Sequence, residues 1–400
     1  MTGATDRPGG ELASGLLDPE LWSTYPYPLL ARLRAEAPMA WHRERGFWAV
    51  SRHADVLAIE TDAATFCAGK GILVDEIGTT FEAPPTILHA DPPLHTRYRR
   101  LVQPGFRPSV IRALEPAVRA RARTLVERLP LGEAVDILTE LAVPLPIQVI
   151  AEMLGVDEAE WGRIHEWSEA AIPGATDWPA ERRQQLLGEM VTYLVTATAQ
   201  RRAEPRSDVL SELALASLDG DQLSDTELAM FLVQLLVAGN ETTRNLIAGG
   251  LVAFAEQPDQ WERLTAQPDL VPIAVEEMLR WTSPVICFLR TATRDTEVGN
   301  QPVAEGEPLL MLFASANRDE EVFGPSAARF DIGRDPNPHL AFGFGNHFCL
   351  GAALARMEAR LVLEELLARA DRFEVAGPVE RTGSSVIAGI RHAALRLHPA

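Results

Sequence analysis

The segment from Phe342 to Gly351 joins one cysteine to glycines, a histidine and aromatic side chains. Gly343 and Gly345 allow the backbone to turn sharply and to approach a flat ligand closely, because glycine has no side chain. Cys349 stands at the entrance of a helix predicted over residues 351–370, where free N–H groups and the helix dipole favour a thiolate and lower the pKa of the thiol. The segment therefore predicts a thiolate that faces a flat ligand.

Two other interpretations of this loop are possible. A free cysteine is most often an inert, buried residue, and a glycine-rich loop before a helix can also hold phosphate groups. However, the third glycine of the dinucleotide fingerprint is missing, and no Lys-Ser/Thr pair follows as in a P-loop. The other cysteines, Cys67 and Cys287, are too scattered to form a disulfide framework or a zinc site with Cys349.

An acid and an alcohol lie inside the longest predicted helix, over residues 224–256. Ser224 and Glu227 form a capping box at its start. Glu241 and Thr242 lie in an otherwise apolar stretch, where an unpaired acid would be costly to bury. Two readings are open: a paired structural acid next to a threonine bonded back to a helix carbonyl, or a pair that transfers protons as a general acid.

The cysteine segment fits the pattern Phe-x-x-Gly-x-His/Arg-x-Cys-x-Gly at Phe342, Gly345, His347, Cys349 and Gly351. It thus resembles the haem-binding signature of cytochromes P450. The resemblance implies that Cys349 is the axial ligand of the iron of haem b, with a sulfur that donates electron density and favours O–O cleavage. It also implies that Phe342 shields the sulfur from water and that Gly343 belongs to the haem-binding loop.

The central helix carries Ala238-Gly239-Asn240-Glu241-Thr242-Thr243, which resembles the oxygen-activation motif of the same family. The resemblance implies a local opening of the helix at Gly239 and Thr242, which makes a groove for dioxygen and water. Ala238 and Gly239 would then contact the haem. Glu241 and Thr242 would relay protons through water toward the bound oxygen.

His95 and Arg99 are spaced i, i+4, so two hydrogen-bond donors lie one helical turn apart and suit a carboxylate lying along the helix. The family resemblance implies that they hold a haem propionate. It assigns Arg290 and His347 as the remaining propionate partners.

Glu277 and Arg280 form a pair three residues apart on one predicted helix face. Such pairs are common on surfaces and contribute little by themselves. The resemblance implies that they close a Glu-Arg-Arg network with Ala328-Arg329-Phe330 under the haem and hold the cysteine loop in place.

The remaining pattern indicates a mainly α chain with minor β structure. The resemblance implies the cytochrome P450 fold, a triangular helical prism with a long central helix and small sheets, and one domain over residues 1–400 whose β-richer part covers about 1–90. We predict strands at 47–51 and within 298–316, and a long loop at 68–85. Helices are predicted at 28–37, 53–60, 93–102, 110–129, 138–154, 158–171, 180–202, 224–256, 270–281 and 351–370.

The bulk composition excludes some functions. The 56 acidic residues outnumber the 37 basic ones and give a net charge of −19, which argues against nucleic acid as a partner. No apolar run approaches the roughly 18 residues of a membrane span, and the N-terminus does not have the order of a signal peptide. We therefore expect a cytoplasmic protein.

The segments that the family uses for substrate contact are largely apolar, which suggests a hydrophobic pocket. We predict a monooxygenase that uses O2 and electrons from a separate ferredoxin and its reductase to hydroxylate or epoxidise a sterol, terpenoid or lipid. A peroxide-driven or non-oxygenating enzyme and a haem sensor are the alternatives. The residues assigned to the pocket are Ile72, Leu73, Val74, Phe231, Gln234, Leu235, Ala238, Pro284, Val285, Ile286, Leu289, Val386 and Ile387, with Trp167, Ile172 and Trp178 beside a lid.

Overall fold

The structure, a computed structural model, describes residues 7–24, 26–80, 85–171, 178–206, 208–218 and 220–399. Helices make up most of these residues, and most follow the predicted ranges. The helices are α1 (Gly10–Ser14), α2 (Pro19–Ser23), α3 (Tyr27–Glu36), α4 (His53–Thr61), α5 (Leu94–Val102), α6 (Pro108–Arg128), α7 (Pro144–Met153), α8 (Trp161–Ala171), α9 (Ala180–Ala203), α10 (Val209–Leu215), α11 (Asp225–Glu256), α12 (Pro258–Ala266), α13 (Val271–Thr282), α14 (Phe313–Ala316), α15 (Glu320–Phe323) and α16 (Ala352–Leu367).

The strands form small sheets. The largest has the order β1-β2-β8-β5-β3, in which β2 and β8 are parallel and the other neighbours antiparallel. A second sheet has the order β4-β10-β9, and β6 pairs with β7. The strands are β1 (Met39–His42), β2 (Phe47–Val50), β3 (Phe66–Cys67), β4 (Ala134–Asp136), β5 (Cys287–Ala292), β6 (Thr296–Val298), β7 (Gln301–Val303), β8 (Pro308–Leu312), β9 (Ala370–Arg381) and β10 (Ile390–Pro399).

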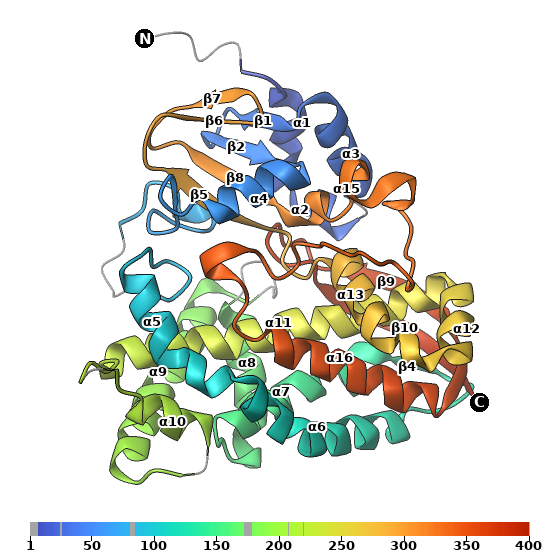
Figure 1. The fold of residues 1–400 in the computed structure, drawn as a ribbon. Coiled ribbons are helices and arrows are strands. Elements are labelled where there is room, and N and C mark those ends of the chain that lie inside the picture. Colours follow the sequence, from blue (N-terminus) through green and yellow to red (C-terminus); the bar gives the residue numbers. More distant parts are fainter. Residues whose placement is uncertain are drawn as a thin grey trace.

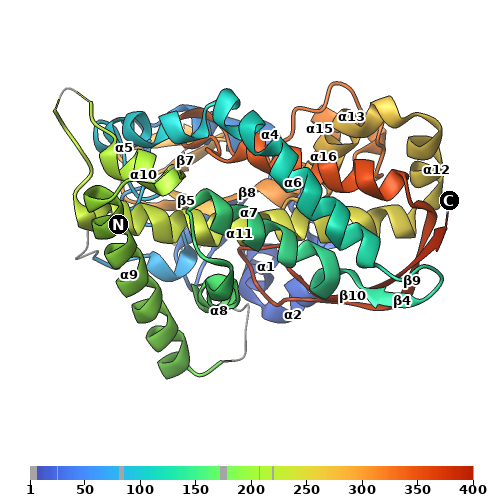
Figure 2. The ribbon, with the colours of Figure 1, turned by 90° about the horizontal axis from the view of Figure 1, so that it is seen from below.

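The long helix α11 crosses the helical part of the molecule (Figures 1 and 2). Its start is fixed by the predicted capping box, since the Ser224 hydroxyl accepts from the N–H of Glu227 and the Glu227 carboxylate accepts from the N–H of Ser224. Thirty-two residues give a length of about 48 Å. Buried residues lie on several sides of α11, which fits a helix surrounded by other elements.

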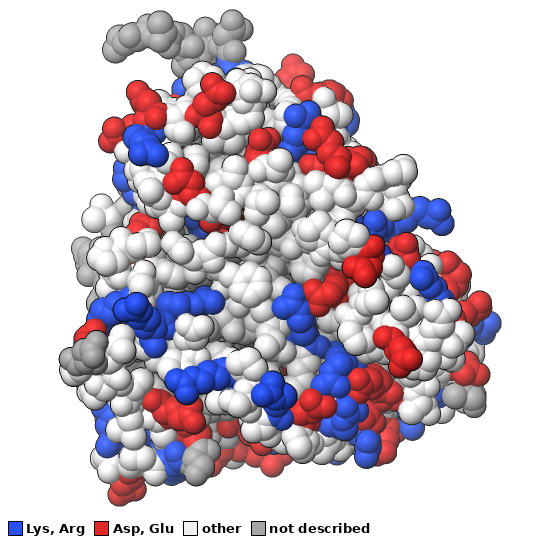
Figure 3. All heavy atoms as spheres, viewed as in Figure 1, with Lys and Arg blue, Asp and Glu red and all other residues white. Residues whose placement is uncertain are grey.

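The N-terminal strands do not form a sheet by themselves. β1, β2 and β3 are joined by β5 and β8, which lie more than 200 residues later in the chain. The buried members of two of the three hydrophobic clusters lie only before residue 70 or after residue 280, whereas the third cluster fills the helical part around α11. Figure 1 shows this β-rich part above the helical part, and the outline in Figure 3 is roughly triangular, as predicted.

One predicted helix is interrupted. Residues 138–154 were expected to be continuous, but they form a π-helical turn at Leu138–Ala142 and then α7, which begins at Pro144. Proline has no N–H to donate and suits the first turn of a helix, so Pro144 starts a new helix instead of continuing the old one. In the described part of the chain, no helix is both long and apolar enough to cross a bilayer.

Candidate functional site

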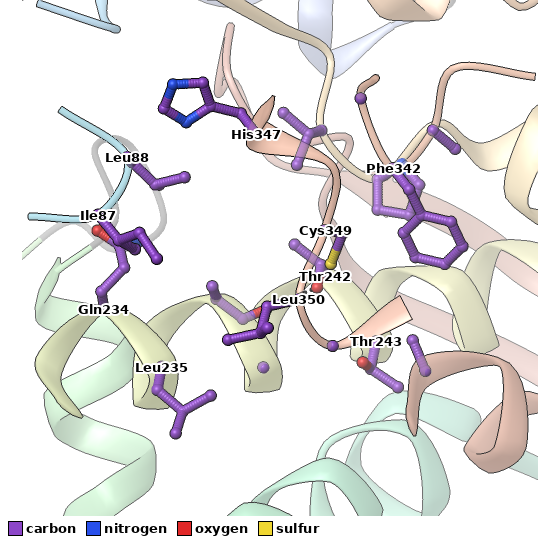
Figure 4. A pocket seen from close by; sticks show the side chains of 18 of the residues that line it. Ile87, Leu88, Gln234, Leu235, Thr242, Thr243, Phe342, His347, Cys349 and Leu350 are labelled. Carbon is purple, nitrogen blue, oxygen red and sulfur yellow. Dashed lines mark hydrogen bonds between the residues drawn. The ribbon is translucent and has the colours of Figure 1, made fainter. Parts of the chain in front are cut away.

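A cavity lies between α11, α16 and the cysteine loop. It contains about 1530 Å³ of space free of protein atoms, which includes the open solvent at its mouth. Figure 4 shows Cys349, Thr242 and Gln234 among the side chains around it. The predicted site residues that line it are His95, Arg99, Ala238, Gly239, Thr242, Arg290, Phe342, Gly343, His347, Cys349 and Gly351.

The cysteine loop has the turns that its glycines predict. Gly343 and Gly345 have φ of 65° and 63°, which other residues rarely adopt. A Cβ on Gly345 would lie 2.3 Å from the carbonyl oxygen of Glu60 on α4, so only glycine allows this close approach. The N–H of Cys349 donates to the carbonyl of Phe342 at 2.9 Å and closes the loop before α16 begins.

The Cys349 thiol does not have the predicted low pKa. Burial raises its pKa, and the N–H of Gly351 together with Arg99 and Arg356 opposes this effect only in part. Desolvation of a thiolate inside the cavity outweighs the effect of the helix dipole on which the prediction rested. A bound metal cation would lower the pKa of this thiol, because a thiol that coordinates a metal is deprotonated outright.

Cationic and imidazole groups converge on one end of the cavity. The rings of His95 and His347 lie 4.3 Å apart, and Arg99 and Arg290 join them in the lining. Burial and these neighbours lower the pKa of His347 to about 2. The Nε2 atom of His95 is buried with no hydrogen-bond partner among the described residues. This donor set is suited to a ligand that carries carboxylates.

One acid in this cluster escaped the sequence analysis. Glu60, on α4, is almost fully buried, and its carboxylate lies 2.9 Å from the Arg290 guanidinium. It also accepts the N–H of Phe344 at 3.0 Å. Nothing in the local sequence marks Glu60, because its partners are far along the chain.

Glu241 and Thr242 are adjacent in the chain but face different surroundings. Thr242 lines the cavity, and its hydroxyl donates to the Ala238 carbonyl at 2.6 Å. Glu241 does not line the cavity: it is 1% exposed and paired with Arg244, which also binds Glu169 on α8. Burial raises the pKa of Glu241 to about 8, against the lowering effect of Arg244.

The expected opening of the central helix is not seen. α11 is continuous from Asp225 to Glu256, and the Thr242 hydroxyl bonds back to the carbonyl four residues earlier. At Gly239, a Cβ would meet only the flexible end of Ile150 at 3.3 Å, so the glycine widens the cavity locally without breaking the helix.

The Glu277–Arg280 pair is fully buried, with both nitrogen–oxygen distances at 2.7 Å. The predicted third member was wrong. Arg329 is exposed and offers only its backbone carbonyl to Arg280, whereas Arg334 donates to Glu277 at 3.2 Å. The network thus joins α13 to the segment that leads into the cysteine loop, as the sequence analysis expected of its role.

The rest of the lining is mainly apolar, but only part of the predicted set contributes. Ile72, Phe231, Leu235, Pro284 and Val285 are confirmed, together with Ile87, Leu88 and Phe288, which the sequence analysis did not select. Ile172 lies outside the described residues. Predicted residues that do not line the cavity are Leu73, Val74, Trp167, Trp178, Ile286, Leu289, Val386 and Ile387.

Two polar residues in the lining differ from their predicted setting. Gln234 was grouped with apolar residues, yet it presents an amide to the cavity. Glu358 on α16 lies in the lining but was not selected at all. Burial raises the pKa of Glu358 to about 8, and its Oε2 atom has no partner among the described residues.

Comparisons with known proteins agree with this geometry. A family model described as cytochrome P450 matches residues 180–381. The chain is 37% identical to linalool 8-monooxygenase of Pseudomonas putida, over 96% of this chain and 98% of that protein. It is 35% identical to steroid C26-monooxygenase of Mycolicibacterium smegmatis, over 92% and 89% respectively. A cytochrome P450 of Mycobacterium marinum solved with pseudoionone superimposes with a TM-score of 0.89 at 34% identity, covering 98% of this chain and 100% of that one.

Proposed function

The chain belongs to the cytochrome P450 family of haem b monooxygenases, and on that premise we propose that Cys349 is the thiolate ligand of its haem iron. One observation carries this assignment: of the three cysteines, Cys349 alone lines the main cavity. Cys67 and Cys287 are buried elsewhere, and burial raises the pKa of both thiols.

The basic cluster would hold the haem propionates. His95, Arg99, Arg290 and His347 supply donors from α5, β5 and the cysteine loop, and the buried, unpartnered Nε2 of His95 supports this role. Gly343 and Gly351 would let the loop backbone lie against the porphyrin, Phe342 would shield the sulfur, and Ala238 and Gly239 would contact the opposite face. When bound, the thiolate-ligated haem supplies oxygen activation and O–O cleavage.

The reaction is the insertion of one oxygen atom of O2 into a C–H bond, or across a double bond, while the other leaves as water. Two electrons and two protons are consumed. We assign the last proton transfer to the Thr242 hydroxyl, which faces the cavity. Glu241 would be the next donor outward, because its raised pKa of about 8 keeps it protonated at neutral pH.

The substrate would be a neutral hydrophobic molecule such as a terpenoid, sterol or lipid. The apolar lining supports this class, since buried apolar surface supplies most of the affinity for such molecules. The names of the relatives point the same way, because linalool, steroids and pseudoionone are all mainly hydrocarbon.

Electrons would come from a ferredoxin that docks where α5, α6 and α16 reach the surface. Figure 3 shows basic side chains, all of them arginines, over these helices, on the face that Figure 1 presents. Arg100, Arg107 and Arg112 are exposed there and form no ion pair with any described residue. An acidic ferredoxin would be attracted to such a surface on a protein of net charge −19.

The ligand assignment is tested by spectroscopy of single cysteine variants. The reduced protein with carbon monoxide should show the long-wavelength Soret band of a thiolate-ligated haem, and Cys349→Ala should lose it. Cys67→Ala and Cys287→Ala are the matched controls and should keep it. Loss of the band in either control, with retention in Cys349→Ala, would place the ligand elsewhere.

A further inference from the structure

Gln234 is a polar exception in the apolar part of the cavity. Its neighbours in the lining include Ile87, Leu88, Phe231 and Leu235. Figure 4 shows the Gln234 side chain on α11, directed toward the side of the cavity where Ile87 and Leu88 are drawn. The amide makes no hydrogen bond to any other residue that the structure describes. It therefore faces the cavity with its donors and acceptor unused by the protein.

An unused amide in an apolar pocket has an energetic consequence. If an apolar ligand covered it, the amide would lose its hydrogen bonds to water and gain none in return, which is unfavourable. A ligand that hydrogen-bonds the amide removes this cost. A site of this kind therefore rejects an analogue that lacks the bonding group.

The charges around the cavity indicate what that group is. Among the described residues, the ionisable lining groups are Glu60, His95, Arg99, Arg290, His347, Cys349 and Glu358, from α4, α5, β5, the cysteine loop and α16. The segments around Gln234, namely the first half of α11 and residues 87–88, contribute no charge to the lining. A carboxylate beside Gln234 would thus be desolvated without a cation, whereas a neutral hydroxyl or carbonyl would be satisfied.

The position of Gln234 on α11 sets the distance between its amide and Thr242. Gln234, Ala238 and Thr242 are spaced by four residues and all line the cavity. Eight residues of α-helix rise about 12 Å, so Gln234 lies roughly 12 Å along the axis from the place where oxygen would be activated. A molecule that spans this interval contacts both.

We propose, resting on the function proposed above, that Gln234 binds the single hydroxyl or carbonyl oxygen of an elongated neutral substrate and so directs oxidation to the end remote from that oxygen. Gln234 is then a specificity-determining residue. The substrate class is narrowed from any hydrophobic molecule to one with an oxygen function at one end and an unactivated C–H bond or alkene at the other.

Three probes with one carbon skeleton test this: geraniol, its deoxygenated hydrocarbon 2,6-dimethylocta-2,6-diene, and geranic acid. Each is titrated into the haem-loaded protein, and the dissociation constant is read from the Soret shift. The wild type should bind geraniol roughly 2- to 10-fold more tightly than the hydrocarbon, which is the range of one net hydrogen bond. Geranic acid at neutral pH should bind most weakly.

The substitution Gln234→Leu keeps the size and removes the amide. It should abolish the preference for geraniol and leave the affinity for the hydrocarbon equal or higher. The matched control is Leu235→Ala, a neighbouring change that should weaken geraniol and the hydrocarbon alike and keep their ratio. Equal wild-type affinities for geraniol and the hydrocarbon, an unchanged ratio in Gln234→Leu, or tightest binding of geranic acid would each overturn the proposal. A protein without the thiolate Soret band would instead refute the function on which it rests.

Discussion

Thr242 and Glu241 divide the proton chemistry between the two sides of α11. The Thr242 hydroxyl is held by the Ala238 carbonyl at the cavity surface. Glu241 is held away from the cavity by Arg244, so it must rotate or act through water to reach that hydroxyl. At the scale of single residues, proton delivery therefore depends on one exposed atom, Oγ1 of Thr242.

Replacing Thr242 with alanine should leave haem and substrate binding unchanged but divert electrons to hydrogen peroxide. Removal of a general acid lowers the rate of the proton-transfer step that it serves by about 10²–10⁴-fold. The measurement is product formed per two electrons consumed in an assay with a ferredoxin and its reductase, with peroxide assayed in parallel. Thr243→Val is the control, because Thr243 also lines the cavity but has no assigned role. Unchanged coupling in Thr242→Ala would remove the proposed role.

Glu358 gives the protein a pH-dependent stability. Burial raises its pKa to about 8 from an ordinary value of 4.5, so the folded state binds this proton more tightly than the unfolded state does. Its contribution to stability is complete below pH 4.5 and is lost as pH rises through 8. Glu358→Gln should therefore reduce the fall in unfolding free energy between these pH values by up to about 5 kcal/mol. Denaturant unfolding at several pH values measures this, and parallel curves for both proteins would contradict it.

The sequence could identify those residues whose role follows from their near neighbours in the chain. Cys349 and His347 belong to one short segment, so their types and spacing are informative before any fold is known. Glu60 and Arg334 acquire their roles from partners in distant segments, Arg290 and Glu277. Only the folded chain brings these charges together, which explains why Glu60 was missed and why Arg329 was chosen in place of Arg334.

At the scale of elements, α8 and α11 are joined through buried charge. Arg244 on α11 binds Glu169 on α8 as well as Glu241, and all three side chains are at most 13% exposed. His165, also on α8, lies near this group, and burial lowers its pKa. One cation thus serves two carboxylates at the contact between these helices.

Arg244→Met should destabilise the protein by about 3 kcal/mol at pH 8, because the two buried acids lose their shared cation and stay buried only by taking up protons, which is costly at that pH. The loss should be smaller at pH 5, where the carboxylates can take up protons. The matched control is Arg182→Met, since Arg182 pairs with Glu166 of α8 at the surface, with both side chains more than 40% exposed. That change should cost less than about 1 kcal/mol. Equal effects of the two substitutions would contradict the buried network.

Element boundaries followed from sequence where caps and periodicity agree, as at the Ser224 capping box of α11. They failed where two helices share one apolar run, as at Pro144, because an apolar run does not show which backbone hydrogen bonds are missing. The mixed sheet could not be predicted from the sequence for another reason. β2 pairs with β8 across some 260 residues, and no residue in either strand specifies its partner. The expectation of one domain over residues 1–400 stays a prediction.

At the scale of the whole molecule, a net charge of −19 coexists with an arginine-rich face over α5, α6 and α16. Several of these arginines are already paired with acidic side chains. Arg97 is paired with Asp221 and Glu227, Arg356 with Glu276, and Arg360 with Glu115 and Glu364. Their charges are largely compensated. Arg100, Arg107 and Arg112 are exposed without an ion pair to a described residue, so they carry most of the attraction for an acidic partner.

Charge reversal at Arg100 or Arg107 should therefore raise the apparent KM for an acidic ferredoxin by roughly 3- to 10-fold at low ionic strength, with little change in substrate binding. Arg356→Glu should have a smaller effect, since Glu276 already neutralises Arg356. Reduction of the wild type should slow as salt screens charges beyond about 8–10 Å.

Arg182→Glu, on α9, is the control for a general change in net charge and should leave the KM unchanged. Because a shift in total charge affects all four variants equally, only a local docking surface predicts that Arg100 and Arg107 differ from Arg182. Salt-independent reduction together with identical KM values in all variants would place the docking surface elsewhere.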